Sequence, residues 1–66
     1  MKKKKNEKLK QALKQNKLSY DRLGRIVGVT GQSIYNAVNG TMPHENTRKA
    51  IAKALDCSVE DIFEIN

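Results

Sequence analysis

Residues 20–39 constrain the fold more than any other part of this chain, because they follow the pattern of two short helices that meet at a sharp turn. Three apolar residues in the first half recur at helical spacing: Leu23, Ile26 and Val27. Gly28 then supplies a residue that can adopt the left-handed conformation in which a helix ends. Thr30 is a good N-cap for the next helix. The pattern predicts one helix over 20–27 and a second over about 31–39.

The second of these helices has two distinct faces. Its buried face is predicted to consist of Ile34, Ala37 and Val38. At about 100° per residue, the opposite face carries Gln32, Asn36 and Asn39, flanked by Ser33 and Tyr35. This outward face is polar, uncharged and rich in amide groups. Taken alone it fits an ordinary solvated surface, and it also fits a surface that reads hydrogen-bond donors and acceptors.

Similar signals predict three more helices. Asn6 precedes a basic amphipathic stretch over about 7–16, and Ser19 is the predicted N-cap of the helix over 20–27. Pro43 blocks a helix, so a fourth helix is expected after it, and Ser58 is expected to cap a short last one. The cap of the fourth helix is predicted to be His44 or Asn46. The three apolar faces are predicted to hold Leu9, Ala12 and Leu13; then Thr47, Ala50, Ile51, Ala54 and Leu55; then Val59, Ile62 and Phe63. With no strand pattern, the chain is predicted to be all-α with five short helices.

Size and composition exclude several classes of function. A chain of 66 residues makes one small domain, with too little core for a large active-site cavity. No acid–base or nucleophile constellation is visible, so we do not expect an enzyme. The single cysteine, Cys57, allows no internal disulfide, and no His/Cys pair has metal-ligand spacing, so no cofactor is expected. No apolar run is long enough for a signal sequence or a membrane span, which predicts a cytoplasmic protein.

The positive charge is concentrated at the N-terminus. Residues 1–17 hold eight lysines and one glutamate, a formal charge of +7; since the whole chain carries +6, residues 18–66 carry −1. The last stretch is acidic, with Asp56, Glu60, Asp61 and Glu64 and no basic residue. One end of the chain is therefore expected to bind polyanions and the other to avoid them.

Several short motifs occur in a fixed order along the chain. They are Leu18-Ser19, Gly28-Val29-Thr30, Gln32-Ser33-Ile34, Asn39-Gly40, the run from Ile51 to Leu55 and the run from Ser58 to Phe63. In this order and at these spacings, residues 7–63 resemble the Cro/cI-type helix-turn-helix family of phage repressors and bacterial regulators. The resemblance implies a compact, five-helix, lambda-repressor-like DNA-binding domain over 6–66, preceded by a flexible basic arm over 1–5.

The resemblance also implies how DNA is bound. The third helix would lie in the major groove of double-stranded DNA, while the second crosses the phosphate backbone. Base contacts are implied for Gly31, Gln32, Ser33, Tyr35 and Asn36. Phosphate contacts are expected from Tyr20, Asn39, Thr41, Lys8 and Lys10. The arm residues Lys2, Lys3, Lys4 and Lys5 are expected to wrap around the duplex, as lysine arms do in family members.

The chain departs from the family pattern at a few positions. Tyr20 replaces a glutamine that often contacts phosphate, and Thr41 stands where lysine or arginine is common, so this loop should anchor DNA weakly. Gly24 stands where alanine is usual and would allow a close approach of helices. Smaller or charged residues also replace apolar ones, which predicts a lean core and modest stability: Ala37, Glu45 and Lys49.

The outward amides favour a particular kind of DNA sequence. Gln32 and Asn36 lie four residues apart, and each amide can pair bidentately with adenine in the major groove. Arginine, the usual reader of guanine, is absent from the third helix. We therefore expect a half-site read mainly at A·T pairs, with the Tyr35 ring available for a thymine methyl group or a phosphate.

The predicted function is that of a repressor that binds a palindromic operator as a homodimer. The dimer interface is predicted at the end of the last helix, from Ile62, Phe63 and Ile65, with Phe63 mainly in the core. The acidic surface could contact RNA polymerase and activate transcription instead. A different class of function stays open: a protein-interaction module of antirepressor or antitoxin type, which would bind a partner tightly and show no salt-dependent affinity for DNA.

Overall fold

The computed structural model describes residues 5–63, and within this range it contains five helices and no strand. The helices are α1 (Glu7–Gln15), α2 (Tyr20–Val27), α3 (Gly31–Val38), α4 (Glu45–Ala54) and α5 (Val59–Ile62). The all-α prediction is confirmed, and each predicted helix is present. None of these helices has the length and apolar character needed to cross a membrane, in the part of the chain described.

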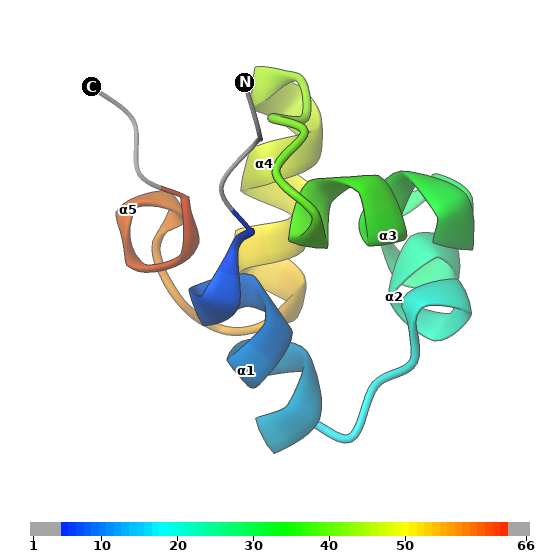
Figure 1. Cartoon of the computed structure of the whole chain (residues 1–66), viewed down its shortest axis with the longest axis horizontal. Coiled ribbons are helices and arrows are strands. Elements are labelled where there is room, and N and C mark those ends of the chain that lie inside the picture. The colour runs from blue at the N-terminus through cyan, green and yellow to red at the C-terminus, as the bar shows by residue number, and fades with distance from the viewer. Residues whose placement is uncertain (1–4, 64–66) are drawn as a thin grey trace.

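Helices α2 and α3 form a packed pair at one side of the molecule (Figure 1). Figure 1 also shows α5 on the opposite side, with α1 and α4 between the pair and α5. Contacts of α4 with both α2 and α5, and of α1 with both α3 and α5, join the two sides. Helices α2 and α3 are therefore held as one unit at an edge of the domain.

Side chains at the helix starts explain why the helices begin where they do. The Asn6 side chain accepts a hydrogen bond from the Leu9 N–H at 3.0 Å. Ser19 accepts one from the Arg22 N–H, and Thr30 accepts one from the Ser33 N–H, each at 3.1 Å. These three predicted N-caps are confirmed, since each satisfies a backbone donor that the first helical turn leaves unpaired. At α4 the N-cap position is His44, which makes no capping hydrogen bond with its side chain.

The helix ends use residues in the left-handed region. Gly28 has φ 85° and Gly40 has φ 108°, as their glycine identity predicts. Two residues without that signal adopt the same conformation: Lys17 (φ 54°) and Asp56 (φ 56°). In both cases the next N–H reaches back to a carbonyl five residues earlier, from Leu18 to Leu13 at 2.9 Å and from Cys57 to Ala52 at 3.0 Å. These bonds identify Schellman motifs that end α1 and α4.

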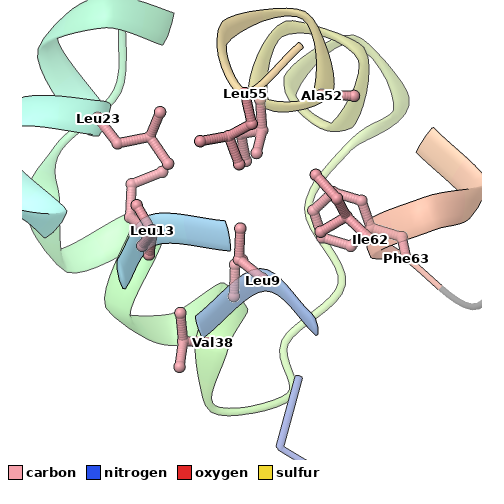
Figure 2. Packing of buried hydrophobic residues seen from close by; sticks show 11 residues of the cluster. Leu9, Leu13, Leu23, Val38, Ala52, Leu55, Ile62 and Phe63 are labelled. Carbon is pink, nitrogen blue, oxygen red and sulfur yellow. The ribbon is translucent and has the colours of Figure 1, made fainter. Parts of the chain in front are cut away.

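The core is formed by apolar side chains from all five helices and the residues that follow α4 and α5. They converge on one space between the helices (Figure 2). The buried residues are Leu9, Leu13, Leu23, Ile34, Ala37, Val38, Ile51, Ala52, Leu55, Ile62 and Phe63. The predicted buried face of α3 is confirmed in full.

The buried core differs from the apolar pattern of the sequence at two positions. Ile26 is 56% exposed, because α2 turns Leu23 and Gly24 inward instead and position 26 falls outside this face. Ala52 is buried although it was not expected in the core. Glu45 and Lys49 of α4 are exposed and form an ion pair at 3.1 Å, in agreement with the lean core predicted there.

Gly24 allows α2 to approach the turn that leads into α3. A methyl group built on Gly24 would lie 2.7 Å from the Val29 carbonyl oxygen and 2.9 Å from the Thr30 carbonyl. The Gly24 carbonyl in turn accepts the N–H groups of Gly28 (2.8 Å) and Val29 (2.7 Å). The expected close approach is confirmed: α2 lies against the backbone of the turn that leads into α3.

Candidate nucleic-acid interface

The outward face of α3 carries four of the five residues expected to contact bases. Gln32, Ser33, Tyr35 and Asn36 are all exposed. The Gln32 Nε2 donates a hydrogen bond to the Asn36 Oδ1 at 3.1 Å, so the two amides lie side by side. This contact uses one donor and one lone pair, and it leaves further donors and acceptors on both amides to face a base pair. Ser33 lies at the start of the helix, where its hydroxyl is 3.1 Å from that of Thr30.

Gly31, the fifth of these residues, has a packing role. It is half-buried, and a methyl group built on it would overlap the Asp21 carboxylate and lie 3.1 Å from the Asp21 Cα. The first residue of α3 thus has to be small because α2 passes against it. Sequence reasoning missed Asp21, whose carboxylate lies at the N-terminus of α3, where a negative charge is favourable.

Two tyrosines that were assigned separate roles lie in contact. Tyr20 begins α2 and is half-buried, whereas Tyr35 on α3 is 48% exposed. Their ring centroids are 5.8 Å apart with an interplanar angle of 72°, an edge-to-face arrangement. The rings line a shallow hollow between the starts of α2 and α3, together with Ser19, Asp21, Gly31 and Gln32.

The C-terminal end of α3 is hydrogen-bonded to Asn6, the residue before α1. The Asn39 Nδ2 donates to the Tyr35 carbonyl at 2.8 Å, and the Thr41 N–H donates to the Asn36 carbonyl at 2.9 Å. The Asn6 N–H donates to the Val38 carbonyl at 2.7 Å. This bond brings the beginning of α1 beside the loop after α3, where Lys5 and Lys8 line one hollow with Gly40, Thr41 and Met42.

The lysines expected at phosphates fall in two places. Lys8 shares the hollow beside Thr41, whereas Lys10 lines a different one with Ser19 and Tyr20, near the start of α2. Both are exposed. Of the arm, Lys5 is exposed, and Lys2, Lys3 and Lys4 lie outside the described residues. The two hollows place positive charge near both ends of the unit formed by α2 and α3.

Acidic side chains lie in several places: Asp21 belongs to the hollow between the starts of α2 and α3, and Glu7 lines the hollow of Lys5 and Lys8. Glu60 and Asp61 are exposed on α5, on the side of the molecule away from α2 and α3 (Figure 1), and Asp56 is exposed just after α4. Burial first, and then the charges of Asp61 and Asp56, raise the pKa of the half-buried Cys57 thiol. The raised pKa favours the protonated form of the thiol, which is the less reactive form.

The residues predicted at the dimer interface are placed differently from the expectation. Ile62 and Phe63 are 3% and 1% exposed, because they close over the core of their own chain. They offer no apolar surface for a partner to cover, which corrects their assignment to an interface and agrees with the core role given to Phe63. Ile65 lies outside the described residues.

A further contact that the sequence did not indicate involves Arg48 of α4. Its Nη1 donates to the Pro43 carbonyl at 2.6 Å and so fastens the loop between α3 and α4. The lone histidine, His44, is exposed next to this loop. Among residues 5–63, no three His, Cys, Asp or Glu side chains form a group that could hold a metal ion. The expectation that no cofactor is needed stays a prediction.

Comparison with known proteins agrees with this geometry. A family model described as the Cro/C1-type HTH DNA-binding domain matches residues 8–66. Neither the curated proteins nor the solved structures gave a significant match. The family match includes α2, the glycine turn and α3, and so covers both the close approach at Gly24 and the exposed amides of α3. The chain belongs to the Cro/C1-type helix-turn-helix family of DNA-binding domains.

Proposed function

We propose that this protein is a transcriptional regulator that binds a specific site on double-stranded DNA, with α3 as the recognition helix. The observation that carries the proposal is the outward face of α3, on which neutral polar side chains stand exposed on a rigid helix pair. Paired amides such as Gln32 and Asn36 match the N6 and N7 groups of adenine in the major groove. No arginine or lysine lies on α3, so the site is expected to be specified mainly at A·T pairs.

The affinity for DNA comes largely from outside α3. Lys8 and Lys10 lie on α1 near the two ends of the helix pair, where they would meet phosphates on either side of the groove. Thr41 and Asn39, at the C-terminal end of α3, are proposed as further phosphate contacts. The arm lysines at positions 2–5 would add charge that acts on any DNA sequence.

The proposed form on DNA is a homodimer. One α3 helix of eight residues offers few base contacts, and a second copy would double them. In helix-turn-helix dimers the two recognition helices enter successive major grooves about 34 Å apart, which requires a palindromic site. Because Ile62 and Phe63 are buried, other side chains must form the dimer seam, and Ile65 is the remaining candidate among those predicted.

The simplest consequence of binding is repression by occupancy, in which the bound protein blocks RNA polymerase. A contact between polymerase and the acidic surface around Asp56, Glu60 and Asp61 would instead produce activation. A regulator of this kind acts where the DNA is, so the expected cytoplasmic location and the absence of an enzymatic activity form part of the proposal. A reporter gene placed behind the bound site distinguishes repression from activation by the sign of its response.

The proposal is tested by selecting bound duplexes from a library of genome fragments at two salt concentrations. We expect a palindromic motif with half-site centres about 10 base pairs apart, specified mainly at A·T pairs. Affinity should fall steeply between the lower and the higher salt concentration, because lysine contacts release counterions from DNA. Recovery of fragments without a shared motif, or binding that does not depend on salt, would contradict the proposal and favour a protein-interaction module.

A further inference from the structure

The contact between Tyr20 and Tyr35 joins the two helices at the surface proposed to face DNA. The ring centroids are 5.8 Å apart and the rings are inclined by 72°. Tyr20 is held at the first residue of α2, next to its N-cap Ser19, whereas Tyr35 extends from the outward side of α3. Because Tyr35 remains 48% exposed with Tyr20 against it, the contact limits the directions the ring can take and leaves part of it accessible.

The surroundings of the pair favour a neutral, apolar group over a phosphate. The hollow that the two rings line also contains Asp21, whose carboxylate lies against Gly31. A negative side chain at this point repels phosphate oxygens. Lys10, which would attract them, lines the neighbouring hollow on the other side of Tyr20. A phosphate near the start of α2 would therefore bind more favourably at Lys10 than at Tyr20.

We infer that Tyr20 is a positioning residue that holds the Tyr35 ring against the C5 edge of a pyrimidine, so that the pair reads the methyl group of thymine. The inference rests on the proposed function, and it assigns Tyr20 a different role from the phosphate contact expected from its position in the family. The thymine methyl is the one apolar group that the four standard base pairs present in the major groove, and aromatic side chains are suited to cover it. The exposed amides of Gln32 and Asn36 stand on the same helix face and would fix the register at neighbouring A·T pairs.

The inference is tested first on the DNA. In a duplex recovered by the genome-fragment selection, each thymine is replaced in turn by deoxyuridine, which removes only the methyl group. We expect one thymine per half-site at which the replacement weakens binding about fourfold, the change that corresponds to the burial of one methyl group. At the same position, 5-methylcytosine should bind more tightly than cytosine. If no thymine is sensitive to removal of its methyl group, the inference is overturned while the proposed function stands.

Substitutions in the protein then separate the ring of Tyr20 from its hydroxyl group. Tyr35→Ala should abolish the sensitivity to deoxyuridine, and Tyr20→Ala should reduce it, because the Tyr35 ring loses its support. Tyr20→Phe keeps the ring and should retain both the affinity and the fourfold sensitivity. If Tyr20→Phe instead binds all duplexes more weakly than the wild type does, the hydroxyl contacts phosphate and the inference is wrong.

Two controls keep the outcomes distinct. Far-ultraviolet circular dichroism and urea unfolding of each variant show whether it folds. If Tyr20→Ala does not fold, the comparison of the wild type with Tyr20→Phe still tests the inference. Gln11→Ala, an exposed change on α1 outside the ring pair and outside the proposed DNA contacts, should leave both the affinity and the sensitivity to deoxyuridine intact. If the selection returns no bound duplex at all, the proposed function fails and the inference fails with it.

Discussion

Gly24 sets how closely α2 approaches the turn before α3. Alanine would place its methyl group 2.7 Å from the Val29 carbonyl oxygen, which belongs to the backbone and cannot rotate away. We expect Gly24→Ala to lower the free energy of unfolding by about 1–3 kcal/mol, although alanine is the better helix former. Urea unfolding followed by circular dichroism measures this, with Gln11→Ala at an exposed position of α1 as the control. A more stable Gly24→Ala variant would show that the turn moves to accommodate the methyl group and that the gain in helix propensity is the larger effect.

At the same scale, the amide pair on α3 should carry specificity and little stability. Gln32 and Asn36 contact each other at 3.1 Å and are both exposed. Gln32→Ala or Asn36→Ala should weaken binding to the selected site by about 1–3 kcal/mol and leave binding to random DNA nearly unchanged. Titration of both duplexes with each variant measures the difference. Equal weakening on the two duplexes would assign these amides to phosphate contacts.

At the scale of the helices, much of the fold could be predicted because its signals are local. Asn6, Ser19 and Thr30 each cap a helix by accepting a hydrogen bond from the N–H three residues later in the chain. Gly28 and Gly40 follow α2 and α3 and adopt the left-handed conformation that glycine takes easily. The ends at Lys17 and Asp56 carry no such signal. There the left-handed residue is followed by Leu18 or Cys57, which pack against the core, so tertiary packing offsets the local cost.

The candidate site likewise has features that could be predicted from the sequence and contacts that could not. The outward face of α3 follows from helical periodicity, which requires only residues of one helix. The contacts of Tyr20 with Tyr35 and of Asp21 with Gly31 join two helices, and they depend on how α2 and α3 pack together. A single sequence holds no signal for such pairs. The burial of Ile62 and Phe63 likewise depends on where α5 docks.

The left-handed conformation of Asp56 leads to a prediction about stability. Left-handed backbone costs an ordinary residue about 1–2 kcal/mol, whereas glycine adopts it freely but loses about 0.5–1 kcal/mol more conformational entropy on folding. Asp56→Gly also removes a negative charge from the C-terminus of α4, where it is unfavourable. We expect the free energy of unfolding to rise by about 1 kcal/mol. Lys53→Gly, within α4, is the control and should lower the free energy of unfolding by a similar amount. If Asp56→Gly lowers it equally, the left-handed conformation of Asp56 does not limit stability.

At the scale of the whole molecule, the residues proposed to give specificity and those proposed to give affinity are separated in space. The helix α3 carries no charged residue, whereas the first 17 residues carry a formal charge of +7. The bond from the Asn6 N–H to the Val38 carbonyl places the start of α1 beside the end of α3, the proposed recognition helix. Lys5 and Lys8 therefore lie next to the Thr41 loop, at the edge of the proposed DNA surface. Glu60 and Asp61 on α5 lie on the side away from α2 and α3 (Figure 1), so we expect a duplex to be repelled at α5 and attracted at the lysines of α1.

This separation predicts how removal of the basic arm should act. Deletion of residues 1–5 leaves the Asn6 cap in place, so the free energy of unfolding should change little while DNA binding weakens on every sequence. The slope of log K against log salt concentration should flatten by about 0.9 for each phosphate that the arm no longer neutralises. Replacing the four arm lysines by glutamine keeps the chain length and should have the same effect, because charge alone is responsible. Lys49→Gln on α4, where the lysine pairs with Glu45, is the control and should leave the slope unchanged. An unchanged slope in both arm variants would place the phosphate contacts on the folded domain, at Lys8 and Lys10, and leave the arm without a role in binding.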